Sequence, residues 1–160
     1  MIGIMADSHD NLEAIKEVIC FFNRIKCDLI IHAGDFVAPF AAKELGKLSC
    51  PVKAVFGNCD GEKKGLTEII QSFGEIKEAP FSFHYNQLKF LVTHLSPFFS
   101  EKSISKNYDI MVFGHTHRPE IRKAKETLLI NPGEAGGWIS GKVTVALLDE
   151  KSITAEIITL

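Results

Sequence analysis

Seven residues in this sequence are of the kinds that bind metal ions, and each stands just after a short apolar run. They are Asp7, His9, Asp35, Asn58, His94, His115 and His117. Two carboxylates, one amide oxygen and four imidazoles form a mixed set of oxygen and nitrogen ligands. Such a set suits manganese, iron, zinc or nickel and differs from the all-oxygen sites that bind calcium.

The number of these ligands indicates two metal ions. Seven ligands are too many for one tetrahedral site, but they suit two divalent cations if one carboxylate bridges them. Asp35 is the natural bridge. Two cations about 4 Å apart lower the pKa of a bridging water, aim it at phosphorus and neutralise the phosphoryl oxygens. The set therefore predicts hydrolysis of a phosphate ester by a metal-bridging hydroxide.

The individual motifs carry different weight. Asp7-Ser8-His9 alone could be a turn and a helix cap, and Gly34-Asp35 alone is ordinary turn chemistry. Gly114-His115-Thr116-His117 favours a metal site more strongly, because two histidines at alternate positions are an unusual way to build a loop. We interpret His32 and His84 as structural, with His32 a weaker candidate for contact with a metal ligand.

Alternating strand and helix patterns position these residues. Apolar runs predict strands at 2–6, 29–31 and 52–55, each followed by a helix, starting near 12, 39 and 66. Asp10 or Asn11 could cap the first helix, and Pro39 suits the first turn of the second. Three such units predict a largely parallel sheet covered by helices, in which loops at the carboxyl ends of the strands converge.

The second half of the chain has a different pattern. Segments 81–85 and 89–93 predict a hairpin around Asn86-Gln87, and a short helix is expected between 97 and 106. Further strands are expected at 110–113, 128–130, 143–148 and 153–158, the last two forming a hairpin. We find no linker or repeat, so the expected architecture is one α/β domain, 1–160, with one mixed sheet or two facing sheets and helices outside.

Composition excludes several classes of protein. An apolar share of 46% with 24% charged residues is ordinary for a globular protein and excludes a disordered chain. No apolar segment approaches the length of a membrane span, and the N-terminus lacks the pattern of a signal peptide. A formal charge of -2 gives no overall attraction to nucleic acid. Four cysteines without a CxxC pair indicate reduced thiols in a cytoplasmic protein.

Taken in order, five motifs resemble those of the calcineurin-like metallophosphoesterases. Within that superfamily the chain is similar to the small phosphodiesterases of the YfcE type from bacteria and archaea, a branch related to the retromer subunit VPS29. Asn131-Pro132-Gly133 also resembles this group. The five motifs are Asp7-Ser8-His9, Gly34-Asp35, Gly57-Asn58-Cys59-Asp60, Thr93-His94 and Gly114-His115-Thr116-His117.

The resemblance implies a fold and a ligand scheme. The fold would be a two-sheet β-sandwich of mixed sheets flanked by helices, in four layers α/β/β/α, with the site at one edge. Asn58 would also contact the substrate phosphate, and manganese would be the usual metal, with nickel, iron or zinc as substitutes. One ion would be held by Asp7, His9, Asp35 and His117, and the other by Asp35, Asn58, His94 and His115.

Three positions depart from the pattern of the family. Many relatives have a histidine, thought to protonate the leaving oxygen, where this chain has Cys59. Cys59 is either a weaker general acid, which predicts slow turnover of esters with poor leaving groups, or an inert thiol. Leu95-Ser96-Pro97 replaces a glycine and a second histidine, and Glu134 stands where a serine is frequent.

The sequence thus predicts a metal-dependent phosphoric ester hydrolase, most simply a phosphodiesterase for small esters. The alternative is a VPS29-like scaffold that binds proteins and has a weak or inactive site. A nuclease or a phosphoprotein phosphatase is chemically close, but the short chain leaves little room for loops that grip a large polymer, and the charge balance weakens the nucleic-acid version. Phe98, Phe99 and Arg118 could line the substrate side or have a core or surface role, and Phe81 and Phe83 could pack against a second subunit.

Overall fold

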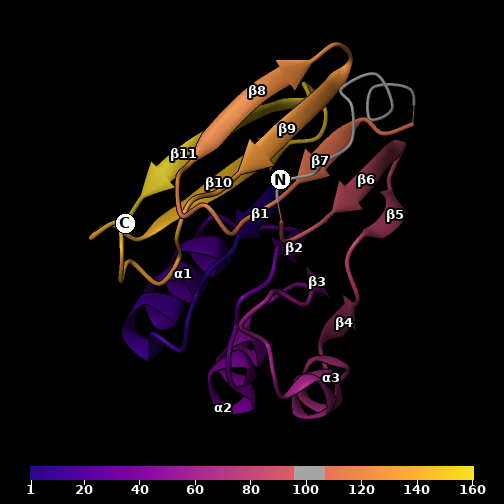
Figure 1. Ribbon diagram of the computed structural model, residues 1–160. Helices are drawn as coiled ribbons and strands as arrows, with labels where there is room; N and C mark the ends of the chain where they lie inside the picture. The colour runs from indigo at the N-terminus through magenta and orange to yellow at the C-terminus, as the bar shows by residue number, and fades with distance from the viewer. Residues whose placement is uncertain (96–106) are drawn as a thin grey trace.

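The computed structural model describes residues 1–95 and 107–160. One of its two sheets contains four parallel strands followed, at one edge, by an antiparallel hairpin that includes the C-terminus (Figure 1). The strand order is β11-β10-β1-β2-β3-β4. The bounds are β1 Ile2–Met5, β2 Leu29–His32, β3 Val52–Val55, β4 Gly74–Lys77, β10 Thr144–Asp149 and β11 Thr154–Thr159.

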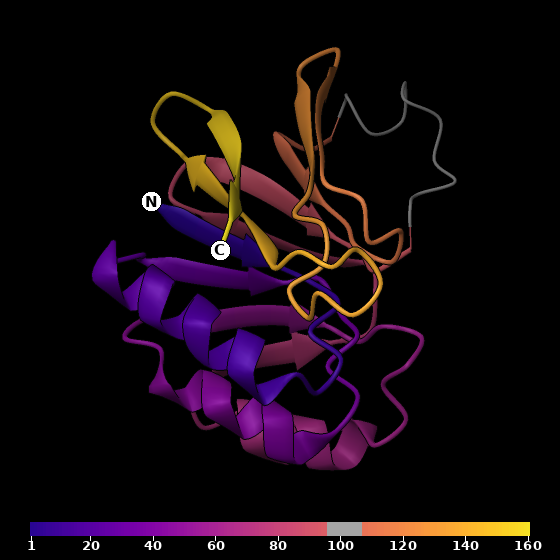
Figure 2. The same ribbon diagram turned by 90° about the vertical axis from the view of Figure 1, so that its left-hand side faces the viewer.

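Three helices cover one face of this sheet (Figure 2). Helix α1, Leu12–Arg24, begins where the side chain of Asn11 accepts a hydrogen bond from the Ala14 N–H group, at 3.3 Å. Helix α2, Pro39–Ala42, continues as the 3₁₀ helix Lys43–Lys47, and α3 spans Lys63–Ile70. No helix within residues 1–95 and 107–160 is both long and apolar enough to cross a membrane.

The second sheet has the order β5-β6-β7-β9-β8 and mixes parallel with antiparallel pairs. Its strands run in the parallel sense from β6 to β7 and from β7 to β9, while β5 and β8 are antiparallel edges. The bounds are β5 Phe81–Tyr85, β6 Leu88–Val92, β7 Ile110–Val112, β8 Glu120–Ala124 and β9 Thr127–Asn131.

Side-chain alternation along the strands explains how the layers pack. In β6, Phe90 and Val92 point into the core between the sheets, whereas Leu91 packs on the outer face of the second sheet. In β1, Ile4 points to the second sheet and Met5 to the helices. Strands β1, β2 and β3 of the first sheet are therefore buried on both faces, which fits their almost continuously apolar sequences.

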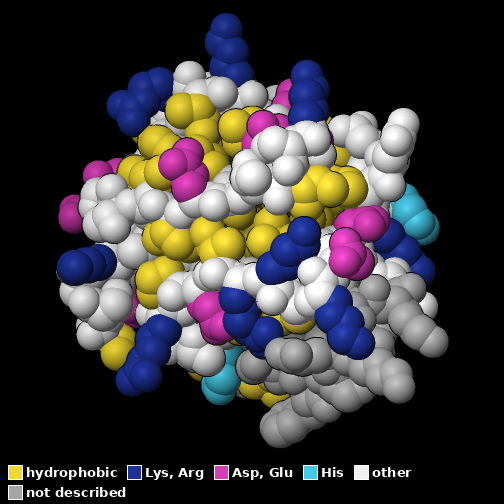
Figure 3. All heavy atoms as spheres, turned by 90° about the horizontal axis from the view of Figure 1, so that it is seen from above, with side chains coloured by type: hydrophobic (Ala, Val, Ile, Leu, Met, Phe, Trp, Pro, Cys, Tyr) yellow, Lys and Arg dark blue, Asp and Glu magenta, His cyan; other side chains and the backbone are white. Residues whose placement is uncertain are grey.

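The core between the sheets is only partly covered at one edge. Strands β8 and β11 contact each other there, at the top of Figure 1. Partly buried side chains of both strands, Ile121 and Ile157, pack against this core. Seen from above, hydrophobic side chains remain visible in the middle of the face, with Lys and Arg side chains around them (Figure 3).

The predicted mixed α/β fold with two facing sheets is confirmed. The strand–helix units, the hairpin around Asn86-Gln87 and the C-terminal hairpin are all present. Two strands, β4 and β8, were not predicted. The helix expected at 97–106 lies outside the described residues, and the helices of the described residues cover the first sheet. The suggestion that Phe81 packs against another subunit is wrong, because its side chain is buried in the core between the sheets.

Candidate metal centre

The predicted ligands follow strands whose carboxyl ends lie at the same edge of the sandwich (Figure 2). His94 follows β6, and His115 and His117 follow β7, one strand later in the chain than the predicted strands alone would place them, because β4 was not predicted. Parallel strands bring loops that are distant in sequence to one edge. The strand–ligand pairs are β1 with Asp7 and His9, β2 with Asp35, β3 with Asn58, β6 with His94, and β7 with His115 and His117.

Most of these residues have an unusual backbone conformation. Five of the seven have positive φ angles, in the left-handed region that side chains other than glycine disfavour. Such strain costs on the order of 1 kcal/mol or more per residue and concentrates at functional sites. The five angles are 54° at Asp7, 40° at His9, 62° at Asp35, 70° at His115 and 57° at His117.

Asp7, His9 and His117 form the first cluster of ligand atoms. The Nε2 atom of His117 lies 3.7 Å from Oδ1 of the fully buried Asp7, and Nε2 of His9 lies 3.9 Å from the same oxygen. His9 Nε2 is itself buried and has no hydrogen-bond partner among the described residues. These separations are too long for hydrogen bonds, but they suit ligands around a shared cation.

Asp35, His94 and Asn58 form the second cluster. His94 Nδ1 lies 2.8 Å from the carbonyl oxygen of Ala33, to which it donates, so its Nε2 faces the site as an acceptor. That Nε2 atom lies 2.9 Å from Asn58 Oδ1 and 3.3 Å from Asp35 Oδ2. Three acceptor atoms this close to each other repel unless a proton or a metal ion lies between them. The cluster therefore fits a cation.

Asp35 stands between the two clusters. Its Oδ2 atom is 3.6 Å from His9 Nε2 and 3.3 Å from His94 Nε2, so one oxygen faces a histidine of each cluster. Its other oxygen, Oδ1, accepts a hydrogen bond from the Cys59 N–H group at 2.8 Å. The side chain is thus held with Oδ2 facing both clusters.

The electrostatics of the two aspartates differ. Burial raises the pKa of Asp7 to about 6, against the opposing effect of the neighbouring histidines His94 and His117. Burial acts in the same direction on Asp35, but a His94 ring that carries both protons, and so donates to Asp35 from Nε2, together with the hydrogen bond from the Cys59 N–H group, outweighs it and holds the Asp35 pKa well below its usual range. A nearby cation would therefore stabilise the charged form of Asp7.

A hollow of about 400 Å³ lies over the two clusters. Exposed His115 lines this hollow, with its ring centroid 5.2 Å from that of His94, although no group of metal-ligating atoms among the described residues includes it. Its backbone N–H group donates to Asp7 Oδ2 at 3.0 Å. Cys59 also lines the hollow, and burial together with the Asp35 carboxylate raises its thiol pKa to about 11.

Two buried polar residues support the ligand loops. His32 accepts the Gly34 N–H group on Nδ1, at 3.1 Å, so its Nε2 carries the proton that it donates to Ser8 Oγ, also at 3.1 Å. The Asp60 carboxylate accepts N–H groups from Asp35 and Gly57, at 3.0 and 2.7 Å. His32 thus touches the neighbours of the ligands, and Asp60 ties the second and third ligand loops together.

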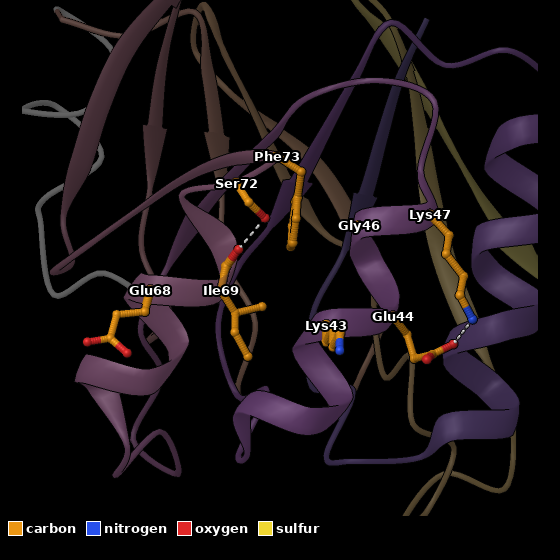
Figure 4. A pocket seen from close by; sticks show the side chains of 8 residues that line it. All are labelled: Lys43, Glu44, Gly46, Lys47, Glu68, Ile69, Ser72 and Phe73. Atoms are coloured by element: carbon orange, nitrogen blue, oxygen red, sulfur yellow. Dashed lines mark hydrogen bonds and ion pairs between the residues drawn. The ribbon is translucent and has the colours of Figure 1, made fainter.

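A second hollow, of about 610 Å³, lies between the 3₁₀ helix and α3 (Figure 4). Figure 4 shows Lys47 paired with Glu44, at 2.6 Å, and Ser72 bonded to the backbone of its own segment. None of the seven predicted ligands lines it. The smaller hollow over the two clusters is therefore the candidate site.

Residues 1–152 match the model of the calcineurin-like phosphoesterase superfamily domain. The chain belongs to this family. A phosphodiesterase of Methanocaldococcus jannaschii is 38% identical over 162 residues, covering 98% of each chain. The phosphodiesterase YfcE of Escherichia coli is 25% identical, over 95% of this chain and 94% of its own.

Comparison with solved structures supports the assignment of this chain to the metallophosphoesterase family. An archaeal phosphodiesterase superposes with a TM-score of 0.89 at 34% identity, covering 99% of both chains. Vacuolar protein sorting 29 from Cryptosporidium parvum superposes with a TM-score of 0.67 at 16% identity, over 99% of this chain and 95% of its own. The second likeness shows a shared fold alone.

Sequence reasoning assigned no role to two features of the metallophosphoesterase site. Glu134, noted only as a departure, is fully buried, and its Oε1 atom lies 3.0 Å from His117 Nδ1. Trp138 and Ile139 line the hollow and were not singled out. The sequence did offer one clue to these residues, because an acidic residue and two large apolar residues stand together in a glycine-rich segment. Of the other expected lining residues, Arg118 does not line the hollow, and Phe98 and Phe99 lie outside the described residues.

Proposed function

We propose that this protein is a phosphodiesterase that depends on two divalent metal ions and hydrolyses small phosphate esters. The observation that carries the proposal is the position of Asp35, whose Oδ2 atom lies within 3.6 Å of histidine nitrogens from both clusters. Manganese is the metal that the family resemblance favours. The names of the two phosphodiesterase relatives support diesters as the substrate class.

The chain's own residues prepare the site for this reaction. His9, Asp7 and His117 would hold one ion, and His94 and Asn58 the other, with Asp35 shared between them and His115 completing the second set from the rim. When bound, the two ions lower the pKa of a shared water and neutralise charge on the phosphoryl oxygens. Asn58 reaches the same hollow and is placed to contact the phosphate.

The pairing of the N-terminal strand with the C-terminal hairpin also supports a single catalytic domain. The hairpin of β10 and β11 pairs with β1, so the C-terminal strands complete the sheet that the N-terminal strand begins. The loop before β10 contributes Glu134 to the hollow. We therefore propose that residues 1–160 act as a single metallophosphoesterase domain.

Hydrolysis of a chromogenic phosphodiester and its matching monoester tests the proposed function. Chelator-stripped protein should be inactive, added manganese should restore diester turnover, and Asp35→Asn should abolish it. Asp28→Asn, which changes an exposed carboxylate outside the hollow, is the matched control and should keep full activity. Folded protein that neither binds nor uses any divalent metal would favour the alternative of a protein-binding scaffold.

A further inference from the structure

Trp138 and Ile139 are the two most exposed large apolar side chains among the described residues. Their exposed fractions are 65% and 76%, and both line the hollow over the metal clusters. Single exposed apolar side chains are ordinary on protein surfaces. Two adjacent ones at a polar site indicate a surface that a ligand covers.

The tryptophan ring is fixed in place. Its indole Nε1–H group donates a hydrogen bond to the carbonyl oxygen of His9, at 3.0 Å. The following backbone is also held, because the Glu134 carboxylate accepts the N–H groups of Ile139 and Ser140, at 2.9 and 2.7 Å. The apolar pair is therefore presented on a hydrogen-bonded loop whose anchors include a predicted metal ligand.

The same loop is joined to the metal-binding loop at its start. The N–H group of Gly136 donates to the Asp7 carbonyl at 2.9 Å, and its own carbonyl accepts from Asn11 Nδ2 at 2.7 Å. A side chain at Gly136 would lie 2.8 Å from the Ser8 carbonyl oxygen, so only glycine allows this approach. The apolar pair and the metal ligands thus form one continuous wall.

We propose that Trp138 and Ile139 bind a planar aromatic group, an aryl ring or a nucleobase, that is esterified to the substrate phosphate. This inference rests on the proposed phosphoesterase function and specifies its substrate class. Among the described residues that line the hollow there is no lysine or arginine, and the two large apolar side chains are Trp138 and Ile139. Indole offers a rigid face on which planar rings stack.

Non-hydrolysable ligands test this preference directly. Phosphonates carry a carbon–phosphorus bond that a phosphoesterase does not cleave, so methylphosphonate, phenylphosphonate and the phosphonate analogue of adenosine 5′-monophosphate can be compared by calorimetry on zinc-loaded protein. We expect phenylphosphonate to bind about tenfold more tightly than methylphosphonate, in line with the strength of ring stacking. The adenosine analogue shows whether a nucleobase or a simple aryl ring is preferred.

Trp138 is the only tryptophan in the sequence, so its fluorescence reports ligand contact without any turnover. Binding of phenylphosphonate should change the emission, and methylphosphonate should change it much less. Trp138→Ser should bring the ratio of the two affinities to about one, whereas Trp138→Phe should keep most of the preference. Phe40→Ser is the matched control, because Phe40 is an aromatic residue that is 58% exposed on α2, outside the hollow.

The outcomes separate this inference from the proposed function. Equal affinities for methylphosphonate and phenylphosphonate in the unaltered protein would overturn the aromatic preference and leave the phosphoesterase proposal standing. Failure of every phosphonate to bind metal-loaded protein would overturn both. If Trp138 became shielded from acrylamide as protein concentration rose, a second copy of the chain would cover the wall, and the substrate assignment would be wrong.

Discussion

The Nδ1 atom of His117 lies 3.0 Å from Oε1 of the buried Glu134 carboxylate. The contact is electrostatic, since its angles do not meet those of a hydrogen bond. On the opposite side of the ring, Nε2 lies 3.7 Å from Asp7 Oδ1. A carboxylate behind a histidine favours the tautomer with the proton on Nδ1, which leaves Nε2 free to bind a metal. Glu134 therefore orients a predicted ligand.

Glu134→Gln should weaken metal binding by about tenfold to a hundredfold, because the charge that orients His117 is lost. Calorimetric titration of manganese into chelator-stripped protein measures this affinity. Glu126→Gln, an exposed position in the turn between β8 and β9, is the control and should bind metal as the unaltered protein does. An unchanged affinity for manganese in Glu134→Gln would show that the Glu134 carboxylate holds its own loop but does not affect metal binding through His117.

Asp7→Asn should stabilise the metal-free protein at neutral pH. The folded-state pKa of Asp7, about 6, lies above the ordinary value of 3.8, so stability contributed by the protonated carboxyl is lost as pH rises between these values. The difference corresponds to a penalty of about 3 kcal/mol at pH 7. Thermal unfolding of the unaltered protein and of Asp7→Asn from pH 4 to pH 8, without metal, measures this penalty.

The same variant should lose stabilisation by metal. At neutral pH the buried Asp7 carboxylate is charged, and this charge destabilises the metal-free protein. Added manganese should therefore raise the unfolding temperature of the unaltered protein most at neutral pH. Asp7→Asn should show a flatter dependence on pH and a smaller response to manganese. If Asp7→Asn were less stable than the unaltered protein at pH 7 without metal, the buried Asp7 carboxylate would not destabilise the metal-free protein.

Cys59→His should accelerate hydrolysis of diesters with poor leaving groups. The Cys59 pKa of about 11 keeps the thiol protonated but makes it a weak acid, whereas imidazole titrates near the working pH. We expect a rise in kcat of about tenfold or more for an alkyl leaving group and little change for a nitrophenyl group. Cys20→His, at an exposed cysteine on α1, is the control. Equal effects on both substrates would argue against proton donation from this position.

The buried parts of the fold were predictable because their patterns are strong. Parallel strands such as Leu29–His32 are continuous apolar runs, and the loops after them carry the ligands. The two strands that were missed, β4 and β8, lie at the edges of their sheets and consist largely of polar or charged residues. They are as long as several strands that were predicted, but they lack a regular apolar alternation, so a sequence pattern does not reveal them.

The supporting residues of the site were less predictable than the ligands. The Asp60 carboxylate accepts an N–H group from Asp35, in another loop, and one from Gly57 in its own. The Glu134 carboxylate accepts N–H groups from Ile139 and Ser140, further along its own loop. These bonds depend on the path that the chain takes through the folded site, which the spacing of residues in the sequence does not reveal. Trp138 was missed for a related reason, since its role follows from a bond to the carbonyl of His9, 129 residues away.

Gly57→Ala should destabilise the protein and impair metal binding. A methyl group there would overlap both Oδ1 and the backbone nitrogen of Asp35, so the Asp35 carboxylate must move. We expect a loss of about 1–3 kcal/mol in the free energy of unfolding, measured in urea, and a lower affinity for manganese. Gly61→Ala is the matched control, because a methyl group at Gly61 meets no atom within 4 Å among the described residues. That variant should be neutral or slightly more stable, through a less flexible unfolded chain. If both alanine variants bound manganese equally well, the close packing of Gly57 against Asp35 would not be what positions the Asp35 carboxylate for metal binding.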